Sequence, residues 1–186
     1  PTDTLDWINS VTGDMIDEER SEGIEISVAV SPGTEYIIID RQKCETVLTN
    51  ILMNAIKHSS KGDRIRIWTE LREGMIRISV SDEGPGLGDV DMSRMFTRFY
   101  KSNNDKYGSG IGLSYSKILV ELHGGKIGTY NNEDKGATFW WEIPVEPAHD
   151  RNRSVPARAY LNELMGYNPG LDITAPESDS FNTGNM

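Results

Sequence analysis

The chain has 186 residues, 37% of them hydrophobic and 26% charged, which is typical of one globular domain with room for a tail. Its formal net charge of −10 argues against general binding to nucleic-acid phosphates, because that requires a basic surface. A single cysteine, Cys44, rules out an internal disulfide, and no apolar run approaches the roughly 20 residues that span a bilayer.

The first third of the chain predicts two helices and two strands. Apolar residues recur at helical spacing over residues 4–22, and Gly23 ends this helix. "IEISVAV" alternates as a strand, "SPGT" is a turn and "EYIIID" is a second strand. Asp40 is placed to cap the next helix, which runs to about His58 and contains Cys44 as a small packed side chain.

The middle of the chain predicts a hairpin, a long loop and a helix. "RIRIWTEL" and "MIRISVSD" read as antiparallel strands joined at "REG". Periodicity then fades over residues 83–109, where only "MSRMFTRFY" could form a short helix, and a loop this long is usually functional. "GIGLSYSKILVELHGG" predicts a helix bounded by glycines, and "KIGTYNN" and "GATFWWEIPV" predict a last pair of strands.

These elements do not alternate as βαβ units, so they favour an α+β fold: a two-layer α/β sandwich, with a mixed sheet of about five strands covered on one face by about three helices. We place this domain at residues 1–146. Residues 147–186 are rich in Asn, Pro, Ser and Asp and predict a polar linker or tail. The opening "PTDTLDWINS" lacks a signal peptide, so we expect a fragment of a larger protein.

The stretch "NILMNAIKHSS" combines an apolar helix face with a polar row. Asn50, Asn54 and Lys57 fall within about 60° of one another on a helical wheel. A solvated face is the simpler reading of Lys57 alone, but a hydrated Mg²⁺ with bound phosphate would use such a row of amide oxygens and a cation. The opposite arc is apolar and predicts contact with the sheet: Leu48, Ile51, Leu52, Ala55 and Ile56.

Asp82 follows the apolar positions of its strand at period two, so it is expected to point toward the packed side. A buried carboxylate needs partners, and the exocyclic amine of adenine would be one. A turn aspartate before Gly84 is the alternative. Gly84 and Gly86 would let a flat base and its ribose approach the backbone closely.

The stretch "GSGIGLS" places Gly108, Gly110 and Gly112 directly before a helix. Free backbone N–H groups at such a terminus attract phosphate, although a flexible hinge has the same composition. The spacing matches neither a P-loop nor a Rossmann fingerprint.

Together these motifs resemble the ATP-binding catalytic domain of sensor histidine kinases, in the superfamily that also contains gyrase, heat-shock chaperone and mismatch-repair ATPases. The family's N box looks like "NILMNAIKHS", its G1 box like "DEGPG", its F box like "MFTRFYKS" and its G2 box like "GSGIGLS". "GGKIGTYNNEDKGATFWWEIP" resembles its closing strands. The resemblance covers about residues 5–145.

The resemblance implies ATP and Mg²⁺ as cofactors, with Asn50, Asn54 and Lys57 as catalytic residues. Asn54 would coordinate the metal with help from Asn50. Asp82 would bind the adenine amino group, supported by Thr138 through water. The residues expected around the nucleotide are Asn50, Asn54, Lys57, His58, Asp82, Gly84, Gly86, Leu87, Arg98, Lys101, Gly108, Gly110, Ile111, Gly112, Leu113 and Thr138.

The long loop would form an ATP lid. The resemblance implies that Phe96 and Phe99 anchor this lid to the body of the domain. Arg98 and Lys101 are candidate cations for the γ-phosphate, or are simply solvated lid residues.

The nature of residue 50 bears on the reaction. ATP-hydrolysing members of the superfamily carry Glu at this position to activate water, and Asn50 cannot act as a general base. The resemblance therefore implies transfer of the γ-phosphoryl group to another nucleophile, a histidine in a separate helical hairpin. None of the three histidines here has the "His-Glu" context of that hairpin, so this chain should not autophosphorylate alone; His123 should instead cap a helix.

The resemblance also implies partners: the histidine-bearing dimerisation domain of the same or a paired kinase, and a response-regulator receiver domain that could follow the tail. We expect a cytoplasmic domain of a membrane-anchored sensor, monomeric as this fragment and homodimeric at full length, with no nucleic-acid partner. The alternative is a serine/threonine kinase of the anti-sigma-factor type, which shares the fold. A degenerate fold kept for protein contacts is a third reading.

Overall fold

The computed structural model describes residues 1–16, 23–88, 92–100 and 110–145. The predicted tail, residues 147–186, lies outside these ranges, so the division into domain and tail stays a prediction. In chain order the described elements are β1 (Thr2–Asp3), α1 (Thr4–Ile16), β2 (Glu25–Ala29), β3 (Tyr36–Ile37), α2 (Arg41–His58), β4 (Arg64–Arg72), β5 (Met75–Ser81), the 3₁₀ turn η2 (Met92–Arg94), α3 (Gly112–Leu122), β6 (Lys126–Asn131) and β7 (Ala137–Pro144).

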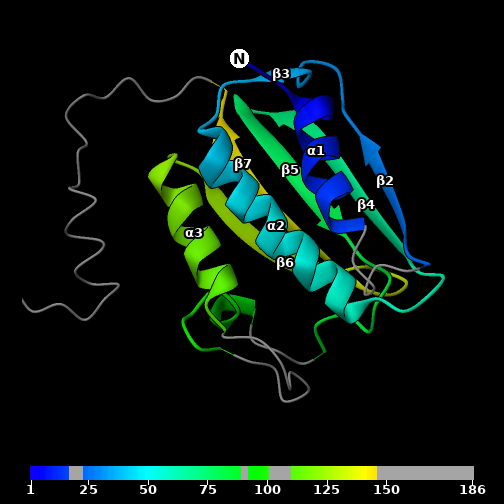
Figure 1. The fold of residues 1–186 in the computed structure, drawn as a ribbon. Helices are drawn as coiled ribbons and strands as arrows, with labels where there is room; N and C mark the ends of the chain where they lie inside the picture. The colour runs from blue at the N-terminus through cyan, green and yellow to red at the C-terminus, as the bar shows by residue number, and fades with distance from the viewer. Residues whose placement is uncertain (17–22, 89–91, 101–109, 146–186) are drawn as a thin grey trace, which may run out of the picture. The chain divides into compact units, whose positions relative to one another are not determined.

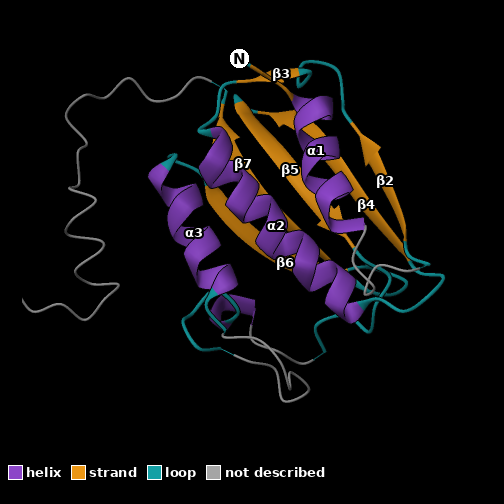
Figure 2. Ribbon diagram, viewed as in Figure 1, coloured by secondary structure: helices purple, strands orange, loops and turns teal. Residues whose placement is uncertain are grey.

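Five strands form one sheet in the order β2-β4-β5-β7-β6. β2 runs parallel to β4, whereas the other neighbours are antiparallel, so the sheet is mixed. The helices α1, α2 and α3 lie across one face of it (Figures 1 and 2). The predicted α+β sandwich, including the β4–β5 hairpin, is confirmed. None of the helices in the described ranges is long and apolar enough to cross a bilayer.

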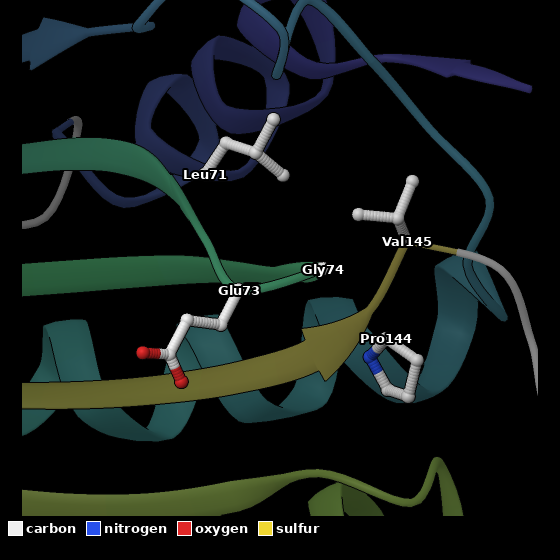
Figure 3. Close-up of a pocket in the computed structure, with 5 residues that line it drawn as sticks. All are labelled: Leu71, Glu73, Gly74, Pro144 and Val145. Carbon is white, nitrogen blue, oxygen red and sulfur yellow. The ribbon is translucent and has the colours of Figure 1, made fainter.

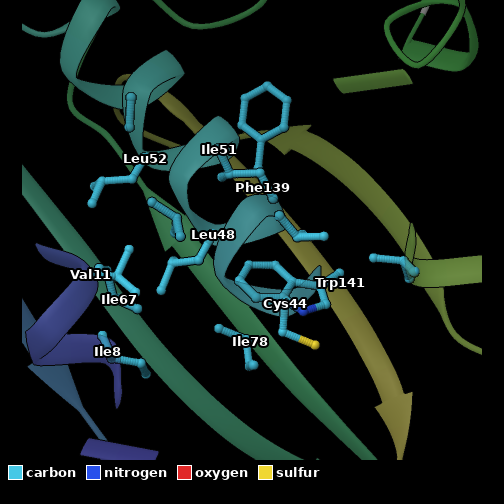
Figure 4. Close-up of a cluster of buried hydrophobic side chains, with 14 of the residues drawn as sticks. Ile8, Val11, Cys44, Leu48, Ile51, Leu52, Ile67, Ile78, Phe139 and Trp141 are labelled. Carbon is cyan, nitrogen blue, oxygen red and sulfur yellow. The ribbon is translucent and has the colours of Figure 1, made fainter. Parts of the chain in front are cut away.

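The core lies between α2 and the sheet. The five residues of the predicted apolar arc of α2 are all buried. Figure 4 shows Leu48, Ile51 and Leu52 of this helix beside side chains from the neighbouring helix α1 and from the sheet. Burial of each such side chain contributes about 1.5–3 kcal/mol, so the apolar arc fixes the orientation of α2 on the sheet. The polar face of the helix must then point away from the core.

The ends of α2 and α3 form as the sequence predicts. Asp40 caps α2, and its side chain accepts a hydrogen bond from the Lys43 backbone N–H at 3.2 Å. His123 is the C-cap residue of α3, with its Nδ1 2.7 Å from the Leu119 carbonyl oxygen. Cys44 is 3% exposed, and burial raises the pKa of its thiol to about 12, as expected for a packed and unreactive side chain.

The strand expected over "EYIIID" is shorter than predicted. Only Tyr36–Ile37 is extended, and it pairs with Thr2–Asp3 rather than with the main sheet. The reason is a long-range anchor: Thr4 donates its backbone N–H to the Glu35 carbonyl and its hydroxyl to the Thr34 carbonyl, at 2.9 and 2.6 Å. These contacts hold the segment beside the start of α1.

The helix expected within residues 92–100 is limited to η2. Phe99 adopts a left-handed backbone conformation with φ 59°, which cannot continue a right-handed helix. The helix expected over residues 4–22 is present to Ile16, and residues 17–22 lie outside the described ranges.

Candidate functional site

The polar face of α2 presents the predicted row of side chains. Asn50 and Asn54 are half-buried and Lys57 is exposed. Asn50 Nδ2 donates to the Gly112 carbonyl oxygen at 3.2 Å and to Ser116 Oγ at 3.1 Å, so this amide also joins α2 to α3. Because its nitrogen is held in this way, Asn50 Oδ1 remains as the acceptor beside Gly112.

Asp82 stands at the end of β5 and is 4% exposed. Its Oδ1 accepts hydrogen bonds from the backbone N–H groups of Gly84 and Ala137, at 2.9 and 3.3 Å. Burial raises the pKa of this carboxyl, although the two backbone donors oppose that effect. Among the described residues no hydrogen bond reaches Oδ2, so this oxygen is left to accept a hydrogen bond from a ligand amine.

The loop after Asp82 packs directly against the end of α2. A Cβ at Gly84 would lie 2.4 Å from the His58 carbonyl oxygen, so only glycine fits there. His58 itself is exposed, and its electrostatic interaction with Asp82 is a minor contribution that lowers the pKa of that carboxyl. Eight residues of helix separate Asn50 from His58, which is about 12 Å. The polar face of α2 therefore runs from the start of α3 to the loop that carries Asp82.

The start of α3 has no side-chain cap from its own N-cap residue. That residue is Ile111, whose side chain makes no capping hydrogen bond to the first-turn N–H groups. Gly110 has φ 69°, and its carbonyl accepts a hydrogen bond from the Phe99 N–H at 3.0 Å. Gly112 lies against the Asn50 amide, and Leu113 packs against the core.

The lid expectations have a mixed outcome. Phe96 packs against the core, as predicted for an anchor. Phe99 is 70% exposed and its backbone is in the left-handed region, so its predicted anchoring role is wrong in this structure. Arg98 is exposed. Lys101 and Gly108 lie outside the described residues.

The expected role of Thr138 beside Asp82 needs a correction. It pairs with Ser81 in the sheet, and its neighbours Ala137 and Phe139 point into the core, so alternation turns the Thr138 side chain to the opposite face. Its hydroxyl donates to Asn132 Oδ1 at 2.7 Å. The structure therefore does not bring Thr138 to the Asp82 carboxylate, and the residue beside that carboxylate is Ala137.

Two residues of the β6–β7 connection escaped prediction. Asn131 Oδ1 accepts the Leu87 backbone N–H at 2.7 Å, beside Gly86. Asn132 Nδ2 lies 2.9 Å from the Asp82 carbonyl oxygen. Asparagine is ordinary in a hairpin turn, so nothing in the sequence marks these two as contacts of the Asp82 loop.

A depression of about 700 Å³ lies elsewhere on the domain, lined by Leu71, Glu73, Gly74, Pro144 and Val145 (Figure 3). Gly74 and Asp82 stand at opposite ends of β5, so this depression is remote from the row on α2. Its lining is mainly apolar and its one charged side chain is a carboxylate, which does not suit a triphosphate.

A search of known families matches residues 39–147 to the family described as histidine kinase-, DNA gyrase B-, and HSP90-like ATPase. The chain belongs to this family. The adaptive-response sensory kinase SasA of Prochlorococcus marinus is 35% identical over 129 residues, covering 67% of this chain and 34% of the relative. The sensor histidine kinase WalK of Bacillus subtilis is 31% identical over 152 residues, covering 76% and 25%.

Solved structures agree with this assignment. The nucleotide-free catalytic domain of histidine kinase ThkA superposes with a TM-score of 0.70 at 28% identity, covering 78% of this chain and 95% of that one. Full-length ShkA in complex with AMPPNP superposes with a TM-score of 0.69 at 30% identity, covering 80% and 31%. This domain is therefore an ATP-binding domain of the histidine kinase type. The chain spans about a third or less of the curated relatives that it matches.

Proposed function

We propose that this domain positions Mg²⁺-ATP for transfer of the γ-phosphoryl group to a histidine on a separate helical hairpin. The observation that carries the proposal is Asp82, a buried carboxylate with one oxygen held by backbone donors and the other left for a ligand amine. The loop after it meets the helix that bears Asn50, Asn54 and Lys57. Base recognition and phosphate binding are thus supported on adjoining elements.

Each residue has a distinct role in the proposed reaction. Asp82 accepts a hydrogen bond from the adenine amino group, and Gly84 keeps the loop against α2. Lys57 and the first N–H groups of α3 neutralise phosphate oxygens, which lowers the charge that builds up during transfer. Asn50 cannot remove a proton from water, which favours transfer over hydrolysis.

The donor set suits Mg²⁺. In the described residues no group of three His, Cys, Asp or Glu side chains could hold a metal ion, so the site would rely on amide oxygens, phosphate oxygens and water. Asn54, one turn from Asn50 on the same face, is the proposed protein ligand, with Asn50 Oδ1 assisting. When bound, the metal would screen the negative charge of the phosphates.

The proposed partners lie outside this chain. They are the histidine-bearing dimerisation hairpin of the same or a paired kinase, and a receiver domain of a response regulator that could follow the tail. A solved structure of ThkA in complex with the response regulator TrrA supports the second partner by analogy. We propose a cytoplasmic domain of a membrane-anchored sensor that is monomeric as this fragment and homodimeric at full length. The anti-sigma-factor type of kinase gains no support from the relatives, which are sensor kinases.

A reconstitution tests the proposal. The chain is mixed with an isolated histidine-bearing hairpin and γ-labelled ATP, with and without Mg²⁺. Acid-labile phosphate on the hairpin, lost in the Asn54→Ala variant, is the expected result. Acid-stable phosphoserine would instead favour the alternative kinase class. Absence of ATP binding by calorimetry would refute the proposal altogether.

A further inference from the structure

The last residue of β6 and the connection to β7, together residues 131–136, contact both ends of the loop at residues 82–87. We propose that this 131–136 turn positions Asp82 and thereby sets the selectivity of the site for adenine, with Asn132 as the main positioning residue. The inference rests on the proposed function, because it assigns adenine recognition to Asp82.

The hydrogen bonds of Asp82 show how strongly it depends on this region. Among the described residues four hydrogen bonds fix Asp82, and one of them, from the Gly84 N–H, comes from its own loop. The Asp82 N–H donates to the Ala137 carbonyl at 3.0 Å, and the Ala137 N–H donates to Oδ1 at 3.3 Å. Asn132 Nδ2 donates to the Asp82 carbonyl oxygen at 2.9 Å. Both sides of the Asp82 backbone and its carboxylate are therefore held from β7 and the turn before it.

Asn132 is the centre of these contacts. Besides the Asp82 carbonyl, its Nδ2 lies 3.0 Å from Ser81 Oγ and 3.0 Å from the Lys135 carbonyl oxygen. Carbonyl oxygens only accept, so the amide nitrogen must face them. The Thr138 hydroxyl donates to Oδ1 on the other side at 2.7 Å. Rotation of this amide would break all of these contacts at once, so its orientation is fixed.

Other residues bring the turn and the loop close together. Gly136 has φ 84°, and a Cβ there would lie 1.9 Å from the Asp82 carbonyl oxygen. Asn131 Oδ1 holds the Leu87 N–H at 2.7 Å at the far end of the loop. On the surface, Lys135 Nζ is 2.7 Å from Asp63 Oδ1 and 3.8 Å from Glu83 Oε2. The turn thus contacts the loop at its first residues and at Leu87.

Selectivity follows from this arrangement. A carboxylate discriminates an amino group from a carbonyl only if its free oxygen stays in place, because a mobile side chain can turn away from a mismatched base. Loss of the Asn132 amide donor frees the Asp82 carbonyl and lets the carboxylate shift. The binding of phosphates by α2 and α3 does not pass through Asn132.

The experiment compares ATP with inosine triphosphate, in which a carbonyl replaces the 6-amino group. The full chain and its Asn132→Asp variant are titrated with both nucleotides by calorimetry. The substitution preserves shape and the acceptor for Thr138 but removes the donor to Asp82. We expect the dissociation constant for inosine triphosphate divided by that for ATP to fall about tenfold. ATP should bind more weakly, and inosine triphosphate should bind almost as before. Asp134→Asn, which changes a charge at an exposed position of the same turn, is the matched control and should leave the ratio unchanged.

A double-mutant cycle separates positioning from mere stability. In an Asp82→Asn background, Asn132→Asp should have no further effect on the ratio, because its effect passes through Asp82. Equal weakening of both nucleotides, or no change in either, would overturn the inference. If Asn132→Asp does not fold, three other variants decide instead. Thr138→Val and Asn131→Ala should both lower the ratio. Asn131→Asp should preserve it. Failure of Asp82→Asn itself to alter the ratio would refute the proposed function rather than this inference.

Discussion

Replacement of Asp82 by asparagine should weaken ATP binding while making the free domain more stable. The amide oxygen of the variant can still accept from the Gly84 and Ala137 N–H groups. Its nitrogen, however, takes the place of Oδ2 and sets a donor against the adenine amino group. Loss of a hydrogen bond to a charged acceptor costs about 1.5–3 kcal/mol. We therefore expect ATP affinity to fall about 10- to 150-fold.

The gain in stability has the opposite cause. Burial raises the pKa of Asp82 in the folded state above that of the unfolded chain, so the ionised carboxylate costs folding free energy at neutral pH. That cost disappears as the pH falls through the folded-state pKa, because the carboxyl of the folded chain then becomes protonated and no longer buries a charge. Asp82→Asn should raise the free energy of unfolding at pH 7. The difference from the parent chain should shrink as the pH falls through the folded-state pKa of Asp82.

Calorimetric titration with ATP and guanidinium unfolding at pH 7 and near pH 4.5 measure the two effects. Asp134→Asn, the same chemical change at an exposed position of the 131–136 turn, is the control and should alter neither quantity. Unchanged ATP affinity in Asp82→Asn would remove the basis for adenine recognition at this residue. A variant less stable than the parent at pH 7 would show that the backbone donors outweigh the cost of burial.

Three further predictions address the metal, the thiol and the backbone. Asn54→Ala should abolish the Mg²⁺-dependent part of ATP affinity, and titrations with and without EDTA would expose any dependence that survives. Because burial raises the pKa of Cys44 to about 12, its thiol should not react with an aromatic disulfide at pH 8 until guanidinium unfolds the chain; rapid native reaction would contradict its burial. Gly136→Ala should destabilise the domain by about 3 kcal/mol or more, because its Cβ would overlap the Asp82 backbone. Gly13→Ala, with no atom within 4 Å of its Cβ in mid-helix, should stabilise the domain by about 0.5–1 kcal/mol, and thermal melts that reversed this order would refute both assignments.

The parts of the fold that could be predicted are those that local sequence patterns determine. The α2 helix has a cap residue, an apolar arc and a break, and all three lie within one segment, so its bounds and buried face followed from the sequence. The β4–β5 hairpin followed for the same reason. β1 could not be foreseen, because two residues form a strand only through contact with a segment more than 30 positions away.

The position of Thr138 was open to prediction and was still missed. Phe139 and Trp141 are large apolar residues at strand spacing, so they had to point into the core, and Thr138, directly before Phe139, had to lie on the opposite face of the sheet. The resemblance to the family's closing strands instead suggested that the Thr138 side chain supports Asp82 at the adenine site. Asn132 is a different case, because its contacts with Asp82 depend on how a turn folds back onto a distant loop, which no local pattern records.

The two faces of α2 explain why a helix with unfavourable interior asparagines belongs at this place in the fold. Leu48, Ile51 and the rest of the apolar arc set its rotation on the sheet, and that rotation fixes the direction of the polar face. Asn50 offsets its low helix propensity by hydrogen bonding to Gly112 and Ser116, which ties the proposed phosphate site at α3 to the same rigid core. A substitution in the apolar arc should therefore disturb nucleotide binding without touching the site, because the core determines where the polar row points.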